Sequence, residues 1–93
     1  MIKVLMERTI KGKQVREIVR LLRMLRVKAI QQPGFISGET LHAVDDPNNY
    51  LVIGTWEKPE DWEAWYNNPE RKELQADLDK FLEVPMKMRV YTY

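Results

Sequence analysis

Apolar and polar residues alternate at the start of the chain, and this period of two predicts a β-strand. Ile2, Val4 and Met6 share one side of the strand, while Lys3, Leu5, Glu7 and Thr9 share the other. The strand ends near Ile10, where Lys11-Gly12-Lys13 supplies a turn.

From Gln14 to Gln31 the apolar period lengthens to three and four residues, which predicts a helix. Its apolar face is formed by Val15, Ile18, Leu22, Leu25 and Ala29. Pro33-Gly34 ends the helix, because proline lacks the amide hydrogen that would continue it.

The middle of the chain returns to strand-like composition. The segments from Phe35 to Val44 and from Tyr50 to Trp56 are rich in β-branched and aromatic residues, and a polar turn at 45–49 separates them. Together they predict an antiparallel hairpin.

The last third predicts helix and then strand. Pro59 opens a short helix that carries Trp62 and Trp65, and Asn67-Asn68-Pro69 interrupts it. A second helix follows, with Leu74, Leu78, Phe81 and Leu82 on one side, and alternation from Met86 to Tyr93 predicts a final strand.

The element order β-α-β-β-α-β predicts a ferredoxin-like α+β fold over a single domain, residues 1–93. Such a fold has a four-stranded antiparallel sheet with helices on one face. Apolar side chains occur on both sides of the strands, for example Val52 on one side and Leu51 and Ile53 on the other. We therefore expect the uncovered sheet face to bind a second copy of the chain in a homodimer.

Composition excludes several kinds of chemistry. The chain has no cysteine and one histidine, which leaves no thiolate ligand or nucleophile and too few ligands for a catalytic zinc site. We expect no metal and no cofactor. No apolar run is long enough for a membrane span or a signal peptide, so the sequence predicts a cytoplasmic protein without a membrane partner.

Charge is unevenly distributed along the chain. Residues 1–34 hold nine Lys and Arg against two Asp and Glu, while residues 35–93 hold six against twelve. Arg16, Arg20 and Arg23 form a basic stripe on the first helix. The stripe is compatible with nucleic-acid binding, but the net charge of +1 and the lack of a recognition motif favour a solvated basic face.

The stretch YLVIGTWEKPEDWEAWY, which starts at Tyr50, resembles the strand, loop and helix of the antibiotic biosynthesis monooxygenase family. In that family a tryptophan ends the strand and another lies on the helix, here Trp56 and Trp65. The Glu7-Arg8 pair on the first strand and the Pro33-Gly34-Phe35 entry to the second agree in order and length. The resemblance implies a dimeric α+β barrel with an apolar cleft between helices and sheet.

Family resemblance also implies a range of activities: cofactor-independent oxygenation of polyketide aromatics, quinol oxygenation and haem degradation. The haem-degrading branch carries an Asn on the first strand, a Trp on the helix, and an iron-binding His ten residues beyond that Trp. This sequence has Glu7, Trp65 and Gln75 in those places. Because glutamine is a poor substitute for an axial imidazole, haem degradation is disfavoured.

Two residues are the first candidates for catalysis. Trp65 offers a flat apolar surface for a planar substrate, although packing of helix against sheet would serve the same side chain equally well. Glu7 lies opposite Val4 and Met6 on its strand. If that is the cleft side, as the resemblance implies, Glu7 is a general base for a phenol or enol; otherwise it pairs with a surface cation, which is the commoner fate of a strand carboxylate.

The other candidates are substrate-binding residues. His42 is a candidate acid/base group or single metal ligand, because histidine is the side chain that ordinarily exchanges a proton near neutral pH. A polar strand position or a place in the dimer interface is the commoner role of a lone histidine that has no second ligand nearby. Tyr66, Asn67, Gln75 and Tyr91 are available to hydrogen-bond a quinone-like oxygen.

These observations lead to one functional hypothesis with alternatives. The hypothesis is a cofactor-independent monooxygenase of a small aromatic, quinol or polyketide-like molecule, with Trp65 for packing and Glu7 for proton transfer. The first alternative is a non-catalytic dimeric module that binds a small ligand. The second is a haem-binding or haem-degrading relative that lacks the usual histidine.

Overall fold

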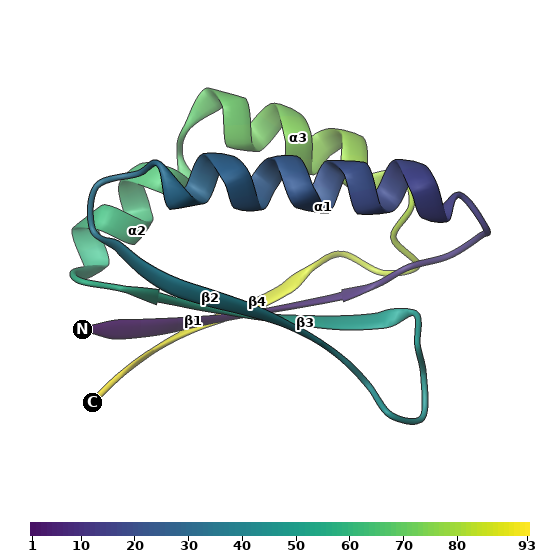
Figure 1. Cartoon of the computed structure of the whole chain (residues 1–93), viewed down its shortest axis with the longest axis horizontal. Coiled ribbons are helices and arrows are strands. Elements are labelled where there is room, and N and C mark those ends of the chain that lie inside the picture. Colours follow the sequence, from purple (N-terminus) through teal and green to yellow (C-terminus); the bar gives the residue numbers. More distant parts are fainter.

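The computed structural model describes residues 1–93 as one sheet covered by one layer of helices (Figure 1). The elements are β1 (Ile2–Thr9), α1 (Val15–Ile30), β2 (Phe35–His42), β3 (Asn49–Trp56), α2 (Pro59–Tyr66), α3 (Pro69–Asp79) and β4 (Lys87–Thr92). The strands pair antiparallel in the order β2-β3-β1-β4. This architecture confirms the predicted ferredoxin-like fold. No helix is long and apolar enough to cross a membrane.

Local sequence signals explain how α2 and α3 begin. Each has a proline in its first turn, where the missing amide hydrogen costs no hydrogen bond. The Asn68 side chain caps α3 by accepting hydrogen bonds from the backbone N–H groups of Glu70 and Arg71. The segment 67–69 therefore separates the two helices of the second crossover, as its composition predicts.

Strand register decides which side chains face the helices. Ile2 pairs with Trp56, Val4 with Gly54 and Arg8 with Tyr50. Because side chains alternate along a strand, the even-numbered residues of β1 and β3 share the helix-covered face. Their odd-numbered neighbours, including Leu5, Glu7, Leu51 and Ile53, share the open face.

Three details differ from the sequence-based expectations. The helix α3 ends at Asp79, so Phe81 and Leu82 lie beyond it, and Leu82 pairs with Ile10 in an isolated β-bridge. The second strand ends at His42 and not at Val44, because the Ala43 N–H donates to the Asn49 carbonyl and closes the turn. In α1 the buried line is Ile18, Leu21 and Leu25, whereas Val15, the first residue of the helix, is 60% exposed. The same three- and four-residue spacing fits either line, so only the docking of the helix selects between them.

The turn between α1 and β2 depends on glycine. Gly34 has a φ of +82°, and a Cβ added there would overlap the Asp61 carboxylate. We expect Gly34→Ala to reduce the free energy of unfolding by about 1–3 kcal/mol, because alanine is strained at positive φ and Asp61 must move. Urea denaturation followed by circular dichroism measures the change.

Gly12 is the matched control for that substitution. Its φ of +81° is nearly the same, but an added Cβ would meet only the flexible side chain of Gln14. Gly12→Ala should therefore cost less than Gly34→Ala. Equal losses would show that backbone conformation alone, and not the Asp61 contact, sets the requirement for glycine.

Candidate functional site

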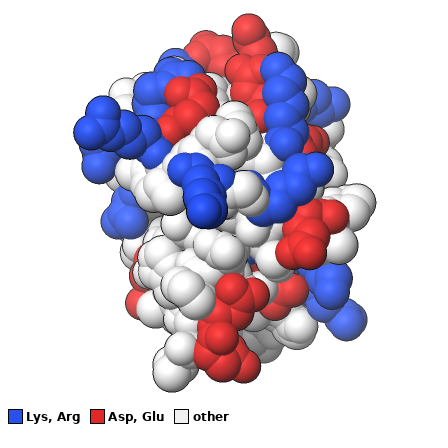
Figure 2. Space-filling model, turned by 90° about the vertical axis from the view of Figure 1, so that its right-hand side faces the viewer, with Lys and Arg blue, Asp and Glu red and all other residues white.

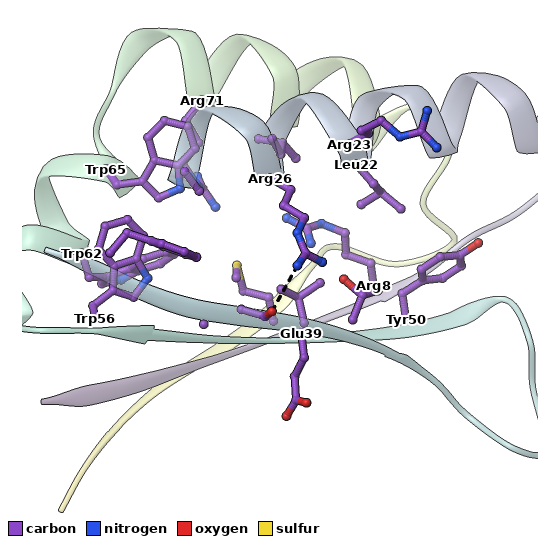
Figure 3. Close-up of a pocket in the computed structure, with 18 of the residues that line it drawn as sticks. Arg8, Leu22, Arg23, Arg26, Glu39, Tyr50, Trp56, Trp62, Trp65 and Arg71 are labelled. Carbon is purple, nitrogen blue, oxygen red and sulfur yellow. Dashed lines mark hydrogen bonds between the residues drawn. The ribbon is translucent and has the colours of Figure 1, made fainter. Parts of the chain in front are cut away.

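A cavity of about 390 Å³ lies between the helix layer and the sheet (Figure 3). Its floor is the covered face of β1, β2 and β3, and α1 lies over it, while α2 and α3 contribute Trp62, Trp65 and Arg71. From Tyr50 to Trp56, both of which line it, β3 advances six residues, or about 20 Å at the usual strand rise. The cavity is therefore elongated and suits a flat molecule of more than one ring.

Aromatic side chains wall one end of the cavity. Trp56 at the end of β3 packs edge-on against Phe35 and Trp62, with ring centroids 5.3 Å and 5.9 Å apart. Trp65 lies one helical turn beyond Trp62, so both indoles face inward. All three tryptophans are buried and line the cavity. Trp65 thus has the position that the family resemblance implies.

Four arginines line the cavity together with these apolar residues. Arg8 rises from β1, Arg71 comes from α3, and Arg23 and Arg26 come from α1. Arg26 bridges α1 and β2 by donating to the Gly38 carbonyl at 3.4 Å. The one acidic lining residue, Glu39, turns its side chain away from the cavity (Figure 3). The electrostatic character of the cavity is therefore cationic.

Arg8 is the most unusual of these residues because its guanidinium is buried without a carboxylate partner. The side chain is only 4% exposed, and its Nη2 donates to Gln75 Oε1 at 2.9 Å. Gln75 in turn donates through Nε2 to Asp79 at 2.7 Å. Burial, assisted by the positive charge of Arg71, lowers the pKa of Arg8 to about 10, so Arg8 stays charged at neutral pH.

Arg71 is buried in the same region by aromatic rings. Its guanidinium lies 4.8 Å from the centroid of Tyr66 and 5.6 Å from that of Trp62, which are cation–π distances. Burial also lowers the pKa of Arg71 below its ordinary value. Arg71 Nη2 and Arg8 Nε are both buried without a hydrogen-bond partner.

Glu7 does not line this cavity. It follows the odd-numbered register of β1 onto the open face of the sheet, opposite Arg8. Its side chain is 44% exposed and lies 4.0 Å from Lys87, so it has the surface cation partner that the alternative interpretation predicts. The cleft side of β1 is the side of Met6 and Arg8, which removes the geometric basis for a base at Glu7.

His42 does line the cavity, at the end opposite the tryptophans. Its ring packs on Tyr50 with centroids 4.3 Å apart, and Nδ1 lies 3.3 Å from the Pro47 carbonyl oxygen. A carbonyl oxygen only accepts hydrogen bonds, so Nδ1 carries the proton in this contact. In the neutral ring this tautomer leaves the lone pair of Nε2 free to accept a proton.

The remaining candidates lie outside the main cavity. Tyr66 and Gln75 border a separate surface depression near α3 and the chain before β4. Asn67 caps the end of α2 by donating to the Glu63 carbonyl. Tyr91 is exposed and pairs with Lys3 in the register of the open face. Gln75 therefore reaches the cavity only through its hydrogen bond to Arg8.

Gln75 also bears on haem binding, because the family resemblance puts this residue, ten positions after Trp65, in the place of the iron-binding histidine. Its amide is engaged on one side by Arg8 and on the other by Asp79. A neutral amide in such a pair offers iron no axial nitrogen ligand. The residues present do not fit a haem site of the family type.

Arg8 and Arg71 were not singled out by the sequence, although a signal existed for both. Arg8 continues the even-numbered apolar series of Ile2 and Val4. Arg71 precedes Leu74 and Leu78 by three and seven residues and so shares their helix face. A charged residue in the apolar phase of an element is expected to be buried, and buried charges require a partner.

The basic stripe of α1 is partly neutralised at the surface. Arg20 donates to Glu17 at 2.6 Å, and Lys28 of α1 lies 2.5 Å from Glu70 of α3. Figure 2 shows basic and acidic side chains interleaved over the helix layer on that side of the molecule. This distribution supports a solvated basic face.

Comparison with solved structures places the chain in a known fold. A conserved protein from Methanosarcina mazei Go1 superposes with a TM-score of 0.90 at 18% identity, over 97% of this chain and 89% of its own. SnoaB, a cofactor-independent oxygenase from Streptomyces nogalater, superposes with a TM-score of 0.87 at 17% identity, over 99% of this chain and 91% of its own. At these identities the likeness establishes the fold.

Sequence comparison establishes the family. Protein SchA from Streptomyces halstedii is 30% identical over 64 residues, which is 69% of this chain but only 16% of that protein. The model of the antibiotic biosynthesis monooxygenase family matches residues 1–77, most of the length, including both tryptophans of the sequence motif. The chain therefore belongs to the antibiotic biosynthesis monooxygenase family.

Proposed function

We propose that this protein is a cofactor-independent monooxygenase of a flat hydroxylated aromatic, quinol or polyketide-like molecule. The observation that carries the proposal is the elongated cavity, which combines tryptophan walls with buried cations. An apolar cavity with a few polar groups is the usual form of a small-molecule site. Family membership and the resemblance to a cofactor-independent oxygenase support the choice of reaction.

The proposed reaction needs no electron donor other than the substrate. Loss of a proton from a phenol or from an activated ring CH₂ gives an electron-rich anion that reduces dioxygen directly. In a CH₂ substrate, one oxygen atom replaces both hydrogens as a ketone and the other leaves as water. A phenol is converted to a quinone with the same balance, because it loses its O–H hydrogen and the ring hydrogen at the carbon that is oxidised, so in both cases the substrate supplies all four electrons. Positive charge beside the anion stabilises it, and the apolar walls strengthen that effect.

His42 is the proposed proton acceptor. It is the lining residue whose neutral form has a free basic nitrogen, because Nδ1 is engaged by the Pro47 carbonyl. Glu7, on the other face, has no access to a substrate in this cavity. Trp65 and Trp62 would pack against the rings of the substrate, while Arg8 and Arg71 would stabilise its negative charge.

The test is oxygen consumption with a panel of quinols and hydroxylated polycyclic aromatics, followed by mass spectrometry of the product formed under ¹⁸O₂. Uptake of one labelled oxygen atom per product, without added cofactor, is the expected result. Saturable binding of these molecules with no oxygen uptake would instead establish the non-catalytic binding module.

We also propose a homodimer formed by the open face of the sheet. That face carries Leu5, Leu51, Ile53 and the 45%-exposed Leu41, without a helix over them. We expect the mass of a dimer in light scattering at micromolar concentration, and a shift towards monomer for Ile53→Glu, since a carboxylate there would be desolvated. A monomer mass for the unmodified chain would contradict this proposal.

A further inference from the structure

Two buried guanidinium groups without carboxylate partners require a physical explanation. Arg8 and Arg71 are each 4% exposed, and each keeps one buried N–H group without an acceptor. Buried charges in proteins are ordinarily paired, because moving an ion out of water is costly. Both side chains line the cavity, so an anionic ligand bound there would compensate their charge.

The charges near the two arginines indicate how much negative charge is missing. Asp79 is the acidic residue whose charge opposes the lowering of the pKa of both arginines by burial, and Gln75 connects it to Arg8. Arg8, Arg71 and Asp79 together carry a net charge of +1, so one monoanionic group would balance these three residues. The exposed Arg23 and Arg26 add further positive charge along the cavity.

The geometry of the neighbouring groups points to where the rest of the ligand lies. Arg71 rests against Trp62, and both line the cavity next to Trp65 (Figure 3). Arg8 stands between this aromatic end and Tyr50 (Figure 3), and His42 packs on the ring of Tyr50. An anion at the arginines would therefore lie next to the surfaces on which a ring system would pack, close enough for both to belong to one molecule.

We propose that Arg8 and Arg71 form a carboxylate subsite, so that the ligand of this cavity is an aromatic carboxylic acid. Guanidinium groups match the two oxygens of a carboxylate, and hydrogen bonds between charged partners are the strong ones. Gln75 acts as a positioning residue, because its amide holds Arg8 and is itself held by Asp79. The inference deepens the proposed function by naming the substrate class.

A purely structural role is the competing explanation. Arg8 ties β1 to α3 through Gln75, and Arg71 packs on aromatic rings of α2. Such a role predicts that removal of the charge destabilises the protein and leaves ligand preference unchanged. A carboxylate subsite predicts the reverse, because an unpaired buried cation is unfavourable in the free protein.

The first measurement is calorimetric binding of 2-naphthoate and of its neutral isostere 2-naphthamide at pH 7.5. We expect the unmodified protein to bind naphthoate at least about tenfold more tightly. The preference should fall to within about twofold in Arg71→Met, while naphthamide binding stays unchanged. Arg16→Met, which removes an exposed arginine outside the cavity, is the matched control and should keep the full preference.

Equal affinity of the unmodified protein for both probes would overturn the proposal, whatever the variants do. A naphthoate preference that survives in Arg71→Met would also overturn it. Tighter binding of 2-naphthol than of naphthoate would do the same, because the site would then be one for a phenolate. Thermal unfolding supplies a second readout: naphthoate should raise the Tm of the unmodified protein but not that of Arg71→Met.

The carboxylate subsite and the proposed monooxygenase reaction are tested by different measurements, so one proposal can be rejected while the other stands. A naphthoate preference without oxygen consumption by any hydroxylated aromatic acid would keep the subsite and remove the monooxygenase. Oxygen consumption with neutral quinols and no preference for the carboxylate would do the opposite.

Discussion

Replacing His42 with alanine is expected to lower the turnover of a substrate that the protein oxygenates by a factor of roughly 10²–10⁴, which is the usual contribution of a positioned general base. The imidazole lines the cavity, and its contact with the Pro47 carbonyl leaves Nε2 as the accepting atom. Since the ring lies at the exposed end of the strand, its removal should change the free energy of unfolding little. Steady-state oxygen consumption gives kcat and KM for comparison.

The division between kcat and KM is what separates proton transfer from simple binding. A base that acts only in the reaction lowers kcat and leaves the affinity for the substrate nearly unchanged. Glu7→Gln serves as the control and should keep turnover within about twofold, because Glu7 is on the other face of the sheet. If His42→Ala were fully active and Glu7→Gln inactive, the assignment of the base would be reversed.

Replacing Trp65 with alanine is expected to destabilise the protein by about 3–5 kcal/mol, the usual cost of emptying a buried tryptophan position. The indole is 4% exposed and forms part of the wall between α2 and the sheet. Since small domains unfold with only about 5–15 kcal/mol, this loss is a large share of the total. Urea unfolding of both proteins, followed by circular dichroism, measures it.

Trp65→Phe is the informative partner of that substitution. It keeps an aromatic ring and most of the packing, so it should fold stably while its reduced ring area weakens the binding of a polycyclic ligand. Tyr66→Ala, at the exposed next position, should cost much less stability than Trp65→Ala. If both substitutions reduced the free energy of unfolding by similar amounts, burial of the Trp65 indole would not be the source of the stability that we assign to it.

These expectations share one physical feature: the cavity is built from the same tryptophans that stabilise the domain. Trp56 is 1% exposed and contacts both Phe35 and Trp62. The same aromatic cluster belongs to the hydrophobic core and also lines the cavity. Substitutions here therefore alter stability and binding together. Arg8 and Arg71 differ from the tryptophans, because burying a charge without a ligand is unfavourable. Replacing either arginine is therefore expected to weaken binding of the anionic ligand without a matching loss of stability.

Local patterns in the sequence were enough to predict the elements and their order. Alternation in residues 2–9, the three- and four-residue period after Gln14, and the prolines that open α2 and α3 all act within a few residues. Such short-range preferences do not depend on the rest of the fold, which is why the sheet and the helix layer were predicted correctly. The exact end of β2 and the buried line of α1 depended on longer-range contacts.

The composition of the site was decided by tertiary structure. Alternation shows that Glu7 and Arg8 point to opposite sides of β1, but only the docking of the helices determines which side becomes the cavity. Likewise the site combines residues from four different elements, namely Arg8, Arg71, Trp65 and His42. No local sequence pattern predicts the distances between them. The sequence by itself therefore determined the fold. The helix-to-sheet packing brought the three tryptophans to one end of the cavity, selected its cationic residues and excluded Glu7, because burial and charge pairing depend on contacts between distant segments.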